Sequence, residues 1–209
     1  SVGQLEASAR TLEQSGALSV AGSTLMNVNT ATLDHSANDF QGEVVFNASG
    51  NVHVVDANAL SVSGQVNGSA QFTAQRVDQS NALQTGSSML VQSENVNLSN
   101  SDNQFNGAVR IENAVEANFN SSGTLSVTGA NLGNVSLTAD EVTLGALGQL
   151  QTLNVVADKV DQNSALLVQG QTTLAVRKAE LSHSSNDFVG DVLVQARAAS
   201  NPDVEITDI

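Results

Sequence analysis

Apolar and polar residues alternate in short stretches along the whole chain. Examples of this alternation are Val52-His53-Val54, Val96-Asn97-Leu98, Val135-Ser136-Leu137 and Leu153-Asn154-Val155. A period of two residues is typical of strands that bury one face. Gly, Asn and Ser separate these stretches, as turns between short strands require. The pattern predicts an all-β protein, in which residues 4–14 form the one plausible helical turn.

One stretch with the core Asn-x-Phe-x-Gly-x-Val occurs three times, at residues 36–44, 101–109 and 184–192. The copies lie sixty-five and then eighty-three positions apart, and an acidic residue followed by Gln precedes each repeat Phe at a constant distance. These pairs are Glu13-Gln14, Asp78-Gln79 and Asp161-Gln162. Repetition of this kind is typical of a solenoid, in which each coil packs on its neighbours.

The segment that lengthens the second interval duplicates its neighbour, because residues 153–160 echo residues 135–142. A stack of coils tolerates such a duplication, since each coil contacts only the coils next to it. A β-sandwich of hairpins is the alternative, and Asn67-Gly68 and Asn106-Gly107 are hairpin-type dipeptides. A sandwich gives no reason for these repeats, so the sequence favours a parallel β-helix.

A shorter apolar period predicts the length of one coil. Large apolar residues recur at a mean interval of about 21 residues, and we expect them to stack over one another in a single column. The members of this column are Leu18, Phe40, Leu60, Leu83, Phe105, Leu125, Leu147, Leu166 and Phe188. We therefore expect residues 1–209 to form a single segment of nine or ten coils. Within each copy of the motif, the Phe and the Val point inward and the Gly lies at a turn. Open coil ends leave strand edges unpaired, so we expect flanking chain, or capping segments at residues 1–12 and 201–209, to cover them.

The composition narrows the classes of partner. A formal charge of −14 with only seven Lys plus Arg argues against nucleic acid and against anionic membrane surfaces. We interpret the acidity as keeping a repetitive β protein soluble; the alternative is recruitment of a basic partner. The chain has no Cys, and no apolar run is long enough for membrane insertion. Its first residues show neither an initiator Met nor a signal peptide, which suggests a mature or excised piece of a longer protein.

No group of residues predicts catalysis. His35 and His183 share one repeat position that Asn100 occupies in the middle copy, so a polar turn position explains them better than a catalytic site. We interpret His53 as a surface residue. Ten acidic residues are expected at coil corners: Asp34, Asp39, Asp56, Asp78, Asp102, Asp140, Asp158, Asp161, Asp187 and Asp191.

Paired carboxylates could serve glycoside hydrolysis, but Asp39 and Asp187 are copies of one repeat position. Asp158, Lys159 and Asp161 form the densest polar cluster, without a recognisable nucleophile or acid. The nonapeptide repeat of calcium-binding rolls is absent. We therefore predict no catalytic, cofactor-binding or metal-binding residues, and the sequence assigns no ligand-binding residues.

Three motifs together resemble a known family of repeats. They are Asn-Asp-Phe-x-Gly-x-Val at residues 38–44, Ala-Asn-Ala-Leu-x-Val-x-Gly at residues 57–64 and Asp-Gln-x-x-Ala-Leu at residues 78–83. They resemble the repeats of filamentous haemagglutinin-like exoproteins, which are large adhesins of Gram-negative bacteria, usually exported by two-partner secretion. The resemblance covers about residues 12–200 and implies a right-handed β-helical shaft, secreted or at the cell surface. The export-directing domain of the family is not evident, which fits an internal fragment.

The expected function is therefore that of a structural shaft in a virulence-associated adhesin that supports cell adhesion, without an enzymatic role. The implied partners are an outer-membrane transporter during export and the flanking β-helical repeats of the same chain. A module that binds a host-cell receptor or glycan is the alternative. A polysaccharide-acting enzyme or tailspike is less favoured, because it needs carboxylates clustered on neighbouring coils.

Overall fold

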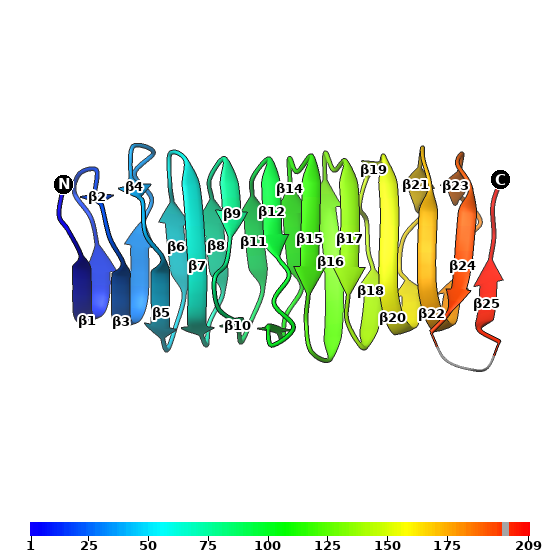
Figure 1. Cartoon of the computed structure of the whole chain (residues 1–209), viewed down its shortest axis with the longest axis horizontal. Helices are drawn as coiled ribbons and strands as arrows, with labels where there is room; N and C mark the ends of the chain where they lie inside the picture. Colours follow the sequence, from blue (N-terminus) through cyan, green and yellow to red (C-terminus); the bar gives the residue numbers. More distant parts are fainter. Residues whose placement is uncertain (198–200) are drawn as a thin grey trace.

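The computed structural model describes residues 1–197 and 201–209 and shows a stack of parallel β-coils (Figure 1). The stack has about 10 turns of about 19 residues each, and the described residues contain no helix. Consequently no described segment is a helix that could cross a membrane. The predicted class, an all-β parallel β-helix, is confirmed.

Most strands belong to ladders that run along the faces of the stack. They are β1 (Leu5–Glu13), β3 (Thr24–Leu33), β5 (Val44–Ala48), β6 (Val52–Val55), β7 (Ala59–Val66), β8 (Ala70–Thr73), β9 (Arg76–Asp78), β10 (Leu83–Thr85), β11 (Met89–Gln92), β12 (Asn95–Leu98), β13 (Gln104–Phe105), β14 (Val109–Glu112), β15 (Glu116–Asn120), β16 (Thr124–Ala130), β17 (Asn134–Thr138), β18 (Glu141–Leu144), β20 (Thr152–Gln162), β22 (Thr172–Leu181), β24 (Val192–Ala196) and β25 (Asp203–Ile206). Two small ladders join β2 (Ser19–Val20) to β4 (Asp39–Phe40), and β19 (Gln149–Leu150) to β21 (Leu167–Val168) and β23 (Asp187–Phe188).

The coil is shorter than the predicted length. Leu5 pairs with Thr24, Thr24 with Val44 and Val44 with Val62, in steps of nineteen, twenty and eighteen positions. The predicted apolar column is therefore wrong as a single ladder. For example, Phe40 pairs with Val20 rather than lying over Leu18.

The error arises because the 65-residue repeat is not a whole number of coils. Gln104 pairs with Gln84, Gln84 with Gln65 and Gln65 with Asn47, so three coils account for fifty-seven positions. The repeat equivalent of Gln104 is Asp39, which lies eight residues before Asn47. Successive copies of the motif are therefore turned by almost half a coil. In Figure 1, β4 and β23 lie along the upper edge, whereas β10, which pairs with β13, lies along the lower edge.

The duplicated segment adds one coil. Val135 pairs with Leu153, and Val142 pairs with Val160, each pair separated by the same interval of eighteen positions. The segment thus stacks directly on the segment that it duplicates, as expected for a stack of coils.

A continuous apolar core fills the stack, built from the inward residues of the alternating strands. The three motif phenylalanines are buried, as are Val44 and Val109, whereas Val192 in the last coils is partly exposed. Residues 4–14 are not a helical turn. They contain β1, which pairs along its length with β3, because parallel pairing satisfies the backbone and turns Leu5 and Leu12 towards the core.

A buried amide holds each copy of the motif at the edge of the stack. Asn38 is fully buried, and its Oδ1 accepts hydrogen bonds from Gln14 Nε2 at 2.8 Å and from the backbone N–H of Leu18 at 2.9 Å. Its Nδ2 donates to Gln14 Oε1, to the carbonyl of Leu33 and to the carbonyl of Val55. One side chain therefore joins the backbones of three successive coils.

The same clamp recurs in the other two copies. Asn103 pairs with Gln79 and bonds the backbone of Leu83, Leu98 and Asn120. Asn186 pairs with Gln162 and bonds the backbone of Leu166 and Leu181. We call these three Asn–Gln pairs the amide clamps; they explain the constant distance between the Gln and the repeat Phe.

The motif glycines allow the coils to approach closely. They lie in bends, but their φ angles are not in the positive region. A Cβ on Gly42 would lie 2.4 Å from the carbonyl oxygen of Gly22, and one on Gly107 would lie 2.4 Å from the carbonyl carbon of Ser87. Gly190 meets Gly170 in the same way.

The terminal segments do not act as caps. Within residues 1–12, β1 is itself a strand of the first coil, and within residues 201–209, β25 pairs with β22 as part of the last coil. Among the described residues, each of these strands has a ladder partner on one side only.

We predict that Asn103→Ala lowers the free energy of unfolding by about 2–4 kcal/mol, because it leaves several buried backbone groups without a partner. Thermal unfolding followed by circular dichroism measures the change. Asn97→Ala is the matched control, since Asn97 is exposed, and its melting midpoint should stay close to that of the parent. Equal midpoints for both variants would show that the clamp is dispensable.

We further predict that Phe105→Ala costs about 3–5 kcal/mol, as large-to-small changes in a core do. Phe105 is 3% exposed, and its ring lies 6.0 Å from that of Phe119 in an edge-to-face arrangement. Val189→Ala serves as the control at an exposed apolar position. An unchanged melting midpoint for Phe105→Ala would contradict its place in the core.

Candidate binding groove

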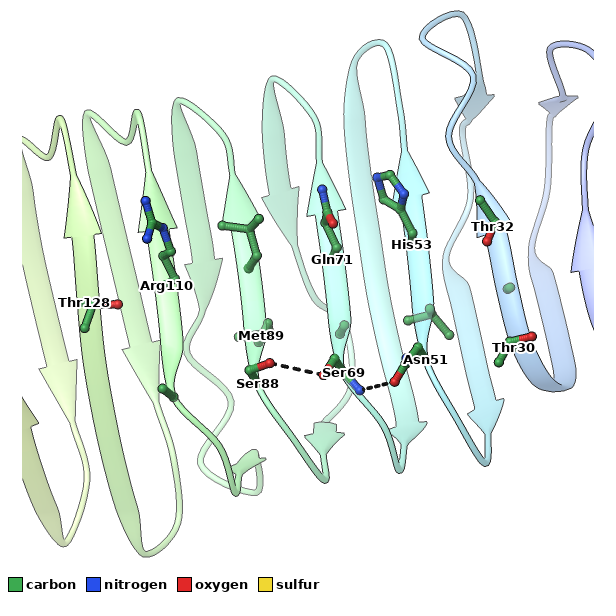
Figure 2. A pocket seen from close by; sticks show the side chains of 15 residues that line it. Thr30, Thr32, Asn51, His53, Ser69, Gln71, Ser88, Met89, Arg110 and Thr128 are labelled. Atoms are coloured by element: carbon green, nitrogen blue, oxygen red, sulfur yellow. Dashed lines mark hydrogen bonds between the residues drawn. The ribbon is translucent and has the colours of Figure 1, made fainter.

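A shallow groove of about 610 Å³ crosses several neighbouring coils on one face (Figure 2). It lies over β3, β6, β8, β11, β14 and β16. The residues that line it are Thr30, Ala31, Thr32, Asn51, Val52, His53, Ser69, Ala70, Gln71, Ser88, Met89, Leu90, Ala108, Arg110 and Thr128.

Two rows of outward side chains flank a buried apolar floor. The ladder register places the first row in the order Thr32, His53, Gln71, Leu90, Arg110 and Thr128. The second row lies two residues earlier in each coil and consists of Thr30, Asn51, Ser69, Ser88 and Ala108. Because the second row is mostly short side chains, the surface is hollow between the rows.

Most of the side chains that flank the apolar floor are polar, and Arg110 is the one among them that carries a formal charge. Asn51 Oδ1 accepts a hydrogen bond from the Ser69 N–H at 2.8 Å, and the hydroxyls of Ser69 and Ser88 lie 3.1 Å apart. Arg110 Nε donates to Glu112 Oε1 at 2.7 Å. This bond, together with one from Gln92, lowers the pKa of Glu112, so the Arg110 charge is already matched.

Polar side chains of the first row, His53 and Gln71 among them, are available to a ligand. Within the described residues, the side chains of His53 and Gln71 form no hydrogen bond to the protein, and both are only half-buried. The interpretation of His53 as a surface residue is confirmed, but no local pattern indicated that it would line a groove. Such an arrangement can hydrogen-bond hydroxyl or amide groups of an uncharged ligand.

The structure confirms the turn interpretation of the repeated His position. His35 Nδ1 accepts a hydrogen bond from the Ala37 N–H at 3.1 Å, and His183 Nδ1 accepts one from the Ser185 N–H at 3.1 Å. Asn100 Oδ1 makes the equivalent bond in the middle copy, at 2.9 Å. These side chains shape the turn that leads into each amide clamp.

The acidic residues do not gather into one site. In the described part of the chain, no group of three or more His, Cys, Asp or Glu is placed to hold a metal ion. Five of the ten aspartates expected at coil corners lie within strands. They are Asp39, Asp78, Asp158, Asp161 and Asp187. For two of these, Asp39 and Asp187, the strand has two residues and lies at the edge of the stack, and Asp158 stacks on Asp140, which lies in a bend.

The cluster around Asp158 is a set of surface ion pairs. Lys159 Nζ lies 2.5 Å from Asp161 Oδ2, while Asp158 faces Arg177 at 3.4 Å and Arg197 at 3.6 Å. Arg197 also donates to the carbonyl of Ala139. The group therefore ties neighbouring coils together on the surface.

A family model described as repeats of unknown function (DUF5649) matches residues 1–47, 49–112 and 132–195. The chain belongs to this family. The unmatched residues 113–131 are about one coil long, which agrees with the extra coil between the second and third repeats. Comparisons with curated proteins and with solved structures gave no match.

Each copy of the motif makes a capping contact that the sequence patterns did not reveal. The N–H of Phe40 donates to Asp56 Oδ2 at 2.7 Å, the N–H of Phe105 to Ser121 Oγ at 3.3 Å and the N–H of Phe188 to Asp208 Oδ1 at 2.9 Å. Each acceptor sits on the next coil. The Asp/Ser exchange and the longer interval between Phe188 and Asp208 hide this position from a simple alignment of the repeats.

Asp56 is the buried member of this set, at 4% exposure. Burial raises its pKa, against the lowering effect of hydrogen bonds from the N–H groups of Phe40 and Asn58, and the charge of Asp39 raises it further. The pKa of Asp56 in the folded protein lies above its ordinary value of 3.8. The protonated carboxyl therefore stabilises the fold, and this contribution is fully present below pH 3.8. It is lost as pH rises through the folded pKa.

We therefore predict that the melting midpoint of Asp56→Asn, relative to that of the parent, rises over a range of pH that starts below the ordinary pKa of 3.8, since the variant has no carboxyl to ionise. Differential scanning calorimetry across this range measures it. Asp34→Asn, at an exposed position, is the control for the loss of one surface charge. A difference that is constant with pH would show that burial does not affect the Asp56 charge.

Proposed function

We propose that this chain is a segment of a rigid β-helical shaft in a large secreted or surface-exposed adhesin, with a structural rather than a catalytic role. The observation that carries the proposal is the unbroken parallel ladder: coils follow one another from β1 to β25 with one continuous core. Such a stack separates its two ends by a fixed distance and gives a long, repetitive surface.

The internal fastening supports this mechanical role. Amide clamps lie at both edges of the stack, each joining neighbouring coils by buried hydrogen bonds. Without Cys, the rod depends on these bonds and on the core. Resistance to bending therefore arises along the whole length rather than at isolated cross-links.

The adhesin context is supported by the resemblance to filamentous haemagglutinin-like repeats of Gram-negative bacteria. On this proposal the chain is a right-handed, internal part of a virulence-associated protein. It crosses the outer membrane through a two-partner secretion transporter and stacks on flanking repeats. The high negative charge is compatible with a solvated shaft outside the cell.

The groove favours a second candidate function, in which this segment itself binds a host-cell glycan or receptor. The observation behind it is the row that contains His53 and Gln71, whose side chains are not engaged by the described part of the protein. A rod can present several such weak contacts at once, and multivalency then raises the overall affinity.

Attachment of beads coated with the 209-residue chain to epithelial cells and to immobilised glycans separates the two functions. For a shaft, we expect attachment equal to that of an unrelated acidic protein. Saturable attachment that soluble chain competes away would instead make the segment a binding module.

Matched variants then locate the binding surface. Ser88→Tyr fills the groove, whereas Asn97→Tyr places the same side chain at an exposed position outside it. Loss of attachment with Ser88→Tyr alone would assign binding to the groove. Attachment that survives both substitutions would place the contact elsewhere and contradict the groove.

A further inference from the structure

The chain contains two Asn-Gly dipeptides, Asn67-Gly68 and Asn106-Gly107. Such dipeptides are typical of hairpin turns, but the strands on either side of them, β7, β8, β13 and β14, pair in parallel with their neighbours. Asn-Gly is also the dipeptide in which an asparagine side chain reacts most readily with the backbone, because glycine has no Cβ to hinder the attack. The fold holds the reacting atoms of the two dipeptides differently.

Asn67-Gly68 is fastened on both sides. The N–H of Gly68 donates to the carbonyl of Gly50 on the preceding coil at 3.2 Å, and its carbonyl accepts from the N–H of Ser87 on the following coil at 3.2 Å. The side-chain Oδ1 of Asn67 accepts a hydrogen bond from Gln65 Nε2 at 2.8 Å. Both the backbone nitrogen of Gly68 and the side-chain amide of Asn67 are therefore held in place.

Asn106-Gly107 is fastened on one side only. The N–H of Asn106 donates to the carbonyl of Thr85 on the preceding coil at 3.0 Å. Within the described part of the chain, neither the backbone of Gly107 nor the side chain of Asn106 forms a hydrogen bond. Alternate residues of a parallel strand direct their N–H groups to opposite neighbours, so the N–H of Gly107 faces the following coil.

The following coil leaves a hollow at this point. The N–H of Ser122 donates to the carbonyl of Asn103 at 2.8 Å, and the ladder between the two coils resumes where Val109 pairs with Val127. Between these contacts lies a hollow of about 530 Å³, which Asn106 and Gly107 line. Water therefore reaches the exposed side chain of Asn106 and the backbone beside it.

We propose that Asn106 is a site of spontaneous modification, at which the backbone nitrogen of Gly107 attacks the side-chain amide carbon. The new C–N bond closes a succinimide ring, the bond from that carbon to the side-chain nitrogen breaks, and the proton of the Gly107 nitrogen leaves with the amide as ammonia. Water then opens the ring at either carbonyl and gives aspartate or isoaspartate. The reaction needs only water, and it occurs at Asn106 rather than at Asn67.

Isoaspartate lengthens the main chain by one carbon where two coils approach closely. A Cβ on Gly107 would lie 2.4 Å from the carbonyl carbon of Ser87, so the lengthened chain has to move away from that coil. The reaction also adds a carboxylate to a chain that already carries a formal charge of −14. Both changes loosen the coil that carries the amide clamp of Asn103. Because no enzyme starts the reaction, the converted fraction records the age of the chain.

Peptide mapping by mass spectrometry of the full 209-residue chain, incubated at neutral and at alkaline pH, tests the proposal. The change in mass from amide to carboxyl marks the reaction, and electron-transfer fragmentation separates isoaspartate from aspartate. We expect Asn106 to react at least about ten-fold faster than Asn67, because Asn67 must first lose hydrogen bonds that the fold provides. The rate at Asn106 should rise with pH, since the attacking nitrogen must lose its proton.

Two controls isolate the effect of the fold. In denaturant the ladder bonds are absent, so Asn67 and Asn106 should react at similar rates. Asn106→Gln blocks the site, because the longer side chain closes a ring much more slowly. The melting midpoint of this variant should stay constant during an incubation that lowers the midpoint of the parent.

Equal rates at the two sites in the folded chain, or a faster reaction at Asn67, would overturn the proposal, because the ladder bonds would then give no protection. It would also fail if Asn106 stayed intact in the folded chain over a time in which both sites react in denaturant. That result would show that the fold holds Asn106-Gly107 as firmly as Asn67-Gly68.

Discussion

The structure depends on hydrogen-bond partners for the backbone N–H and C=O groups wherever a coil changes direction at a buried edge. A strand pairs with the coils on both sides, but a bend interrupts that ladder and leaves N–H and C=O groups without partners. Asn38, Asn103 and Asn186 solve this problem with one buried amide each, which accepts from one coil and donates to others. The partner Gln holds that amide in place through a reciprocal pair of hydrogen bonds.

The ratio between the repeat and the coil decides where these clamps lie. A repeat of three whole coils would place every clamp on one edge and leave the other edge to turns alone. The observed repeat exceeds three coils by eight residues, so successive clamps lie at nearly opposite edges. The inserted coil before the third copy preserves this alternation, because a whole coil does not change the angular position of the coils after it.

The sequence predicted the architecture because local and long-range patterns agreed. Alternation in Val52-His53-Val54 predicted a strand, and the duplicated Leu153 segment predicted stacking; both predictions are confirmed. The coil length was wrong because Leu and Phe fill inward positions on every face, so residues in different ladders looked like one column. Residues 4–14 were misread because their strand is set by pairing with β3, which no local propensity shows.

The candidate groove was harder to predict, since it depends on which outward residues become neighbours across coils. His53, Gln71 and Arg110 lie far apart in the sequence, and only the register of coils with slightly different lengths places them in one row. One geometric quantity, the number of residues per coil, therefore determines the edge on which each clamp lies and the residues that form the groove.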